Sequence, residues 1–146
     1  MVATRDWHPS PDQEPGFAHF AAEPDWVDTW PAHCVAGTAG AEPHPALALP
    51  DGAVIVRKGQ RAAAYSGFEG HDQAGRPLGT VLADRSIDTV DVVGLATDHC
   101  VRATALDAAA RGLTVEVLAP LVAGVAPATT ERALAELRAA GVTIVA

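Results

Sequence analysis

Residues 89–118 read TVDVVGLATDHCVRATALDAAARGLTVEVL, in which two β-branched runs flank an alanine-rich segment. The runs 89–93 and 114–118 have the length and composition of strands that are buried on both faces. The segment from His99 to Arg111 ends at Gly112, a residue suited to a helix C-cap. This stretch therefore predicts a strand, a helix and a second strand.

The same alternation continues on both sides of this stretch. Further β-branched runs predict strands at 53–56 and 142–145, and helical patterns occur at 77–84 and 129–140. Alternating strands and helices predict an α/β fold with three αβα layers, in which a mostly parallel, Rossmann-like sheet has helices on both faces. A length of 146 residues with 49% hydrophobic side chains suits one domain, residues 1–146.

Charge and hydropathy exclude two classes of partner. Acidic residues outnumber basic ones by 18 to 10, so the chain has no basic field for nucleic acid. No apolar run approaches the roughly 20 residues of a membrane span, and the N-terminus lacks a signal-peptide pattern. We therefore expect a soluble, cytoplasmic protein with no membrane partner.

The first 50 residues contain candidate metal ligands within proline-rich sequence that is typical of long ordered loops. Asp6 and His8 are separated by one residue, which places both side chains on one face of an extended segment. His19 and His33 follow, and one carboxylate with three imidazoles suits zinc, iron or manganese. The alternative is that these are loop histidines without a metal, since spacing alone does not establish His19 and His33.

Cys100 and Lys58 are candidates for nucleophilic chemistry. Cys100 follows a strand by a short turn and begins a helix, whose N-terminal amides and dipole stabilise a thiolate. The alternative is a small buried side chain beside an ordinary helix N-cap at Thr97 or Asp98. Lys58 is the only lysine beside nine arginines and ends a strand, where an ammonium would favour a thiolate or carboxylate.

Four motifs together cover the chain from Val2 to about Val125. They are TRDWHP at 4–9, WPAHCV at 30–35 running on to GAE at 40–42, AYSGFEG at 64–70, and GLATDHCV at 94–101 running on to ALDA at 105–108. Their combination resembles the nicotinamidases of the isochorismatase-like cysteine hydrolase superfamily. The resemblance implies that family's α/β fold for the whole chain.

The resemblance also implies a ligand set for one divalent metal. It assigns Asp6, His8 and His33 as ligands, with His19 as a fourth. Zinc is the first expectation for the ion, and iron or manganese are the alternatives.

Catalytic and substrate-binding roles follow from the same motifs. The resemblance assigns Cys100 as the nucleophile and Lys58 as the cation of the catalytic triad. The oxyanion hole would use the backbone N–H groups of Ala96 and Cys100, with a cis peptide bond between Leu95 and Ala96. The substrate pocket would be lined by the side chains of Trp30, Tyr65 and His99.

The implied activity is hydrolysis of nicotinamide to nicotinate and ammonia through a cysteine thioester, a step of NAD salvage, with pyrazinamide as a further substrate. The expected binding partner is then a small-molecule substrate. The sequence leaves open whether the protein forms a homo-oligomer. Two alternatives remain. One is another amide hydrolase of the superfamily that uses no metal, and the other is an inactive module that keeps the ligand pocket.

The third triad residue of this family is an aspartate that ends the strand preceding the one matched by Met1–Thr4. These 146 residues contain no such segment, so we expect an N-terminally truncated domain that lacks about 30 or more residues, one strand and its crossover helix. Two strands of the sheet would then lack a backbone partner. We expect weak metal binding and slow turnover from the chain as given.

Overall fold

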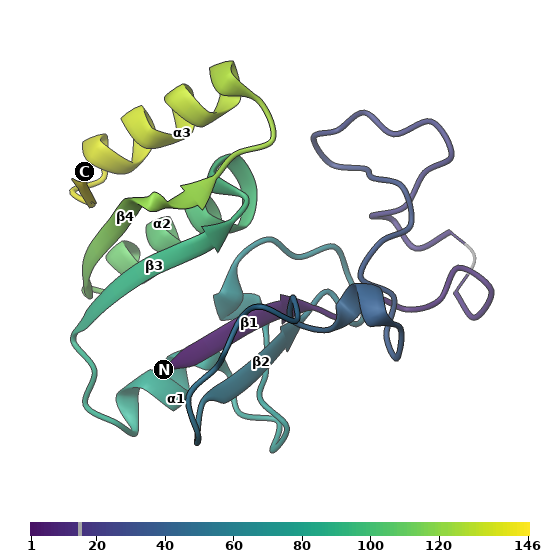
Figure 1. Ribbon diagram of the computed structural model, residues 1–146, viewed down its shortest axis with the longest axis horizontal. Coiled ribbons are helices and arrows are strands. Elements are labelled where there is room, and N and C mark those ends of the chain that lie inside the picture. Colours follow the sequence, from purple (N-terminus) through teal and green to yellow (C-terminus); the bar gives the residue numbers. More distant parts are fainter. Residues whose placement is uncertain (15) are drawn as a thin grey trace. The chain divides into compact units, whose positions relative to one another are not determined.

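The computed structural model describes residues 1–14 and 16–146, which form two compact units. The first unit contains residues 1–64 and 69–76, and the second contains residues 65–68 and 77–146. Figure 1 labels most of their helices and strands. No helix within the described ranges is long and apolar enough to cross a membrane.

The first unit is built on two parallel strands joined by a long loop. β1 (Val2–Asp6) lies beside β2 (Val54–Lys58) and pairs with it (Figure 1). The register sets Asp6 directly opposite Lys58. A 3₁₀ turn, η1 (Ala39–Ala41), lies within the connecting loop. Regular structure is otherwise sparse between the strands, as the proline-rich composition predicts.

The second unit contains a parallel sheet with the order β3-β4-β5. Its strands and helices alternate along the chain (Figure 1), and a 3₁₀ turn, η2 (Gly67–Glu69), precedes them in sequence. The elements are α1 (Leu78–Ala83), β3 (Thr89–Leu95), a π-helical turn η3 (Thr97–Val101), α2 (Arg102–Ala110), β4 (Thr114–Ala123), α3 (Pro127–Ala139) and β5 (Thr143–Val145).

The hydrophobic core of the second unit joins two helices to the central strand. Ala105 and Ala108 of α2 lie with Val115 and Val117 of β4, and Leu137 of α3 is fully buried in the same cluster. Small alanine side chains allow the helix backbone to approach the sheet closely, and β-branched residues fill a strand between its neighbours. This core holds the turn between β3 and α2 in place.

The α/β class with parallel strands is confirmed, with two differences in detail. The strands form two separate sheets, in which β1 pairs only with β2, and β3 only with β4, among the described residues. The prediction that this strand is buried on both faces is wrong for β3, because exposed and half-buried residues alternate along it. Val93 and Leu95, on its outer face, are 49% and 73% exposed.

Candidate metal centre and cysteine turn

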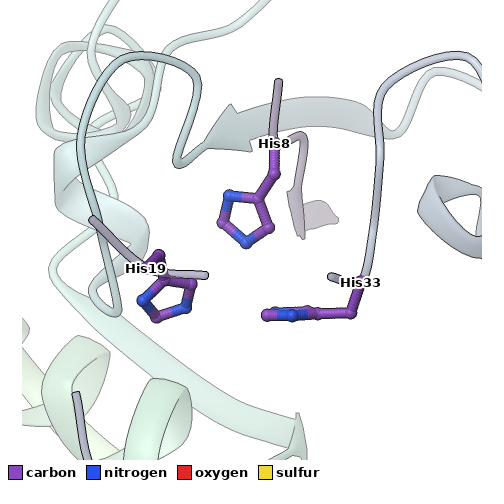
Figure 2. A group of neighbouring side chains, drawn as sticks. All are labelled: His8, His19 and His33. Atoms are coloured by element: carbon purple, nitrogen blue, oxygen red, sulfur yellow. The ribbon is translucent and has the colours of Figure 1, made fainter. Parts of the chain in front are cut away.

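Three histidines from separate parts of the first unit converge on one space (Figure 2). The ring centroids of His8 and His19 are 5.0 Å apart, those of His8 and His33 are 4.9 Å apart, and those of His19 and His33 are 5.4 Å apart. One ring nitrogen of each lies within 4.8 Å of the others. We call this group the histidine trio. It contains three of the four ligands that the sequence predicts.

Two rings of the trio are oriented by backbone carbonyl groups. Nδ1 of His8 lies 2.9 Å from the oxygen of Gly59, and Nδ1 of His33 lies 2.8 Å from the oxygen of Pro31. A carbonyl oxygen only accepts, so each Nδ1 carries the hydrogen and each Nε2 keeps its lone pair. Nε2 of His8 is buried and has no hydrogen-bond partner within the described ranges. A metal ion would satisfy that atom, so these residues fit one.

Burial keeps two of these rings in the form that binds metals. Desolvation lowers the pKa of His8, and it lowers the pKa of His19 to about 4 with help from His8 and His33 nearby. Both imidazoles are therefore neutral near pH 7, so protons compete little with a cation for their lone pairs.

Aromatic side chains lie close to the trio. The ring of Phe17 is 5.4 Å from that of His8, and the ring of Phe20 is 5.5 Å from it. Trp30, a predicted pocket residue, has its ring 6.4 Å from that of His33. Apolar neighbours of this kind help to set the local dielectric around a metal site.

Backbone pairing in the loop explains how distant residues reach this centre. His8 pairs with Val35 in an isolated parallel bridge, and Phe20 pairs with Trp30 in another. The first bridge brings the segment that carries His33 beside the end of β1. The second brings the segment after His19 beside the same region.

Asp6 and Lys58 form an ion pair at the carboxyl ends of β1 and β2. Lys58 is 3% exposed, and its Nζ also donates to the oxygen of Ala64 at 3.0 Å. Oδ1 of Asp6 lies 3.7 Å from Nε2 of His8, so this predicted ligand is close to the trio. A hollow of about 610 Å³ is lined by Lys58 and its neighbours in this unit, a size typical of small-ligand pockets.

Cys100, the predicted nucleophile, lies in the π-helical turn η3 between β3 and α2. The amides of His99 and Val101 donate to the oxygen of Ala96 at 3.1 and 3.0 Å, which closes the turn. The peptide bond between Leu95 and Ala96 is cis, as the resemblance implies. Single π-helical turns within helices occur often at functional sites. The structure thus places Ala96 and Cys100 on the same tight turn.

Asp98 stabilises this turn from within the second unit. Its carboxylate accepts hydrogen bonds from the amides of Val125 and Ala126, at 3.0 and 3.2 Å, and from the hydroxyl of Thr129. Burial would raise the pKa of Asp98, but these donors outweigh it and lower the pKa. Asp98 therefore anchors the segment that leads into α3, a different helix from the one that its position in sequence indicates.

Two of the predicted pocket residues come together in the second unit. The rings of Tyr65 and His99 are 5.3 Å apart and tilted by 39°. Both side chains are partly buried. The third pocket residue, Trp30, belongs to the first unit.

Two residues close to the candidate metal centre were missed by sequence reasoning. Cys34 lies in a second group of ligand atoms with Asp6 and His33. Gly59 supplies the carbonyl group that orients His8. Cys34 was visible as the neighbour of His33 in its motif, whereas a backbone carbonyl has no signal in the sequence.

Comparison with known proteins assigns the chain to a protein family. The chain belongs to the isochorismatase family, since the model of the isochorismatase domain matches residues 2–146. Within that class, it is 49% identical to the nicotinamidase/pyrazinamidase of Mycobacterium tuberculosis, across 99% of this chain and 75% of that protein.

Solved structures show the same relationship. The pyrazinamidase of Pyrococcus horikoshii in complex with zinc has a TM-score of 0.82 and 41% identity, over 99% of this chain and 73% of that one. The PnC1 protein of L. infantum in complex with nicotinate also has a TM-score of 0.82, with 36% identity, over 99% of this chain and 70% of that one.

Proposed function

We propose that this protein hydrolyses nicotinamide to nicotinate and ammonia, as its relatives' names indicate for them. The observation that carries the proposal is the histidine trio, whose His8 and His33 rings each direct Nδ1 at a backbone carbonyl and leave Nε2 to a ligand. Cys100 on its closed turn supplies the nucleophile. Pyrazinamide, an amide on a similar ring, is the second substrate that we propose.

The metal in this proposal is zinc, held by His8, His19 and His33 with Asp6 beside them. The histidine donors and their carbonyl partners fit zinc, which accepts nitrogen ligands whose other ring nitrogen is hydrogen-bonded. Bound there, the ion would hold the ring nitrogen of the substrate and orient the carboxamide.

The chemistry itself belongs to side chains and backbone of this chain. The thiolate of Cys100 attacks the carboxamide carbon, and the backbone N–H groups of Ala96 and Cys100 stabilise the oxyanion. The carbon–nitrogen bond then breaks, and the leaving nitrogen takes up a proton as ammonia departs. Water hydrolyses the thioester, which gives nicotinate and restores the thiolate.

Lys58 has a positioning and electrostatic role in this proposal. Its buried ammonium is held by Asp6 and by the carbonyl of Ala64, so its charge is fixed in place. A fixed cation favours anionic groups during the reaction.

In this proposal, Tyr65 and His99 contact the substrate ring by stacking or edge contacts. The assignment of Trp30 to the substrate pocket stays a prediction from the sequence. A cytoplasmic location, a homo-oligomer and a role in NAD salvage stay predictions from the sequence.

Metal dependence tests this function against a metal-free amide hydrolase of the same family. Nicotinate formation is measured by chromatography with the protein as purified, after chelator treatment, and after zinc is restored. We expect formation to be lost with the chelator and to return with zinc. Equal formation in all three samples would refute the metal-assisted mechanism.

A further inference from the structure

A second set of ligand atoms overlaps the histidine trio. One atom each from Asp6, His33 and Cys34 lie within 4.8 Å of one another, and all three residues are partly buried. We call this group the thiol set. His33 belongs to both groups. An ion on the thiol set therefore competes for His33 with an ion on the trio.

The backbone holds Cys34 in a defined position. Its φ is +45°, a left-handed conformation that residues other than glycine rarely adopt. The amide of His8 donates to the oxygen of Cys34 at 3.0 Å, and the amide of Ala36 donates to the oxygen of His8 at 2.8 Å. These bonds fix the segment that carries the sulfur against the end of β1.

A small cavity borders two of the three members of the thiol set. It has a volume of about 140 Å³ and is lined by Asp6 and Cys34, among other residues. This space exceeds that of a single water molecule, so an ion with its remaining water ligands fits there. The cavity lies within the first unit, as do all members of the set.

The charge balance around the thiol set favours a thiolate ligand, which the histidine trio lacks. Asp6 is already paired with Lys58, so its negative charge is largely compensated. A thiolate at Cys34 would supply the charge that a divalent cation needs. Thiolate sulfur is a soft ligand that favours cadmium and cobalt(II) over manganese, which prefers oxygen.

We propose that Cys34, His33 and Asp6 form a second binding mode for soft divalent metal ions, alternative to the histidine trio. The sulfur–metal bond forms as the Cys34 thiol releases its proton to solvent. Cadmium and cobalt(II) take the thiol set, whereas manganese forms no bond to the Cys34 sulfur. The proposal does not need Cys100 or amide hydrolysis, so it can fail while the proposed function stands.

Cobalt(II) is the probe, because thiolate coordination gives it a near-ultraviolet charge-transfer band that nitrogen and oxygen ligands do not. The metal-free 146-residue chain is titrated with cobalt(II), alongside Cys100→Ser, Cys34→Ser and His19→Ala. We expect the band in the wild-type chain, in Cys100→Ser and in His19→Ala, and its loss in Cys34→Ser. An absent band in the wild-type chain, or a band that survives Cys34→Ser, would overturn the proposal.

A protection experiment avoids dependence on the Cys34→Ser fold. In Cys100→Ser, Cys34 is the single remaining thiol. Cadmium should slow its reaction with a thiol reagent strongly, and manganese at the same concentration should leave the rate unchanged. Equal rates with cadmium and without metal would overturn the proposal independently.

Discussion

Nδ1 of His8 lies 2.9 Å from the carbonyl oxygen of Gly59, the residue directly after Lys58. One short segment at the end of β2 therefore holds both the buried ammonium and the orientation of a metal-binding ring. Gly59 has a φ of +71°, and a Cβ built on it would lie 2.3 Å from Cε1 of His8. Only glycine fits at this close approach.

Replacing Gly59 with alanine should damage the metal centre. The added methyl group displaces the His8 ring and breaks its carbonyl bond, and loss of such an outer contact typically weakens metal affinity about 10- to 100-fold. Zinc affinity of Gly59→Ala is measured by competition with a chromophoric chelator. The matched control is Gly52→Ala, because Gly52 has a φ of +78° but no atom within 4 Å of its added Cβ. Equal zinc affinity in the two variants would contradict this account of Gly59.

Breaking the ion pair of Asp6 and Lys58 should destabilise the protein. Lys58→Met leaves the Asp6 carboxylate without its buried partner, and removing one member of a buried pair costs about 3–5 kcal/mol. Asp6 is partly exposed, so we expect the lower end of that range. Denaturant unfolding of both single variants and the double variant Asp6→Asn/Lys58→Met measures the coupling. Strictly additive losses would show that the pair does not stabilise the fold.

Loss of the Asp98 carboxylate should loosen the cysteine turn and α3 together. Asp98→Ala removes the acceptor of two backbone amides, and leaving such donors unpaired costs roughly 1–3 kcal/mol. Asp107→Ala is the control, because Asp107 is a partly exposed acid on α2 that pairs with Arg111 at i,i+4. Thermal unfolding should separate the two variants. Equal midpoints would refute this role of Asp98.

The stability of the metal-free protein should fall as the pH is lowered from 6.5 toward 4. The pKa of His19 is lowered from 6.5 to about 4 in the folded chain, so the unfolded chain binds more protons within this window. The slope from this one group is at most about 1.4 kcal/mol per pH unit. Unfolding of the wild-type chain and of His19→Gln is compared at several pH values. Parallel curves for the two proteins would rule out this contribution of His19.

Much of the fold could be predicted from hydrophobic patterns, and the misses have physical causes. The strand predicted at 114–118 continues as β4 to Ala123, past Pro120. Pairing between β4 and β5 ends at Leu118. Pro120 lies beyond this point, so its missing N–H interrupts no hydrogen bond to β5. The continuation pairs instead with Gly94 and Leu95 of β3 after a register shift. A periodicity argument cannot anticipate such a change of pairing.

The candidate site could be predicted only in part from residue spacing. Asp6 and His8 share the end of one strand, so their proximity follows from local geometry. His19 and His33 reach the same centre through loop bridges between residues that lie far apart in sequence. Asp98 reaches Val125 and Ala126 across 27 and 28 positions, a contact that only the folded unit creates.

The most direct test of the central claim is ammonia release from nicotinamide by the zinc-supplied 146-residue chain, with Cys100→Ser as the background. Serine keeps the size of the side chain but is a much weaker nucleophile at neutral pH. Circular dichroism and zinc content first establish that both proteins are folded and loaded. We predict ammonia release by the wild-type chain that exceeds the Cys100→Ser background. Equal release by the two folded, zinc-loaded proteins would contradict it.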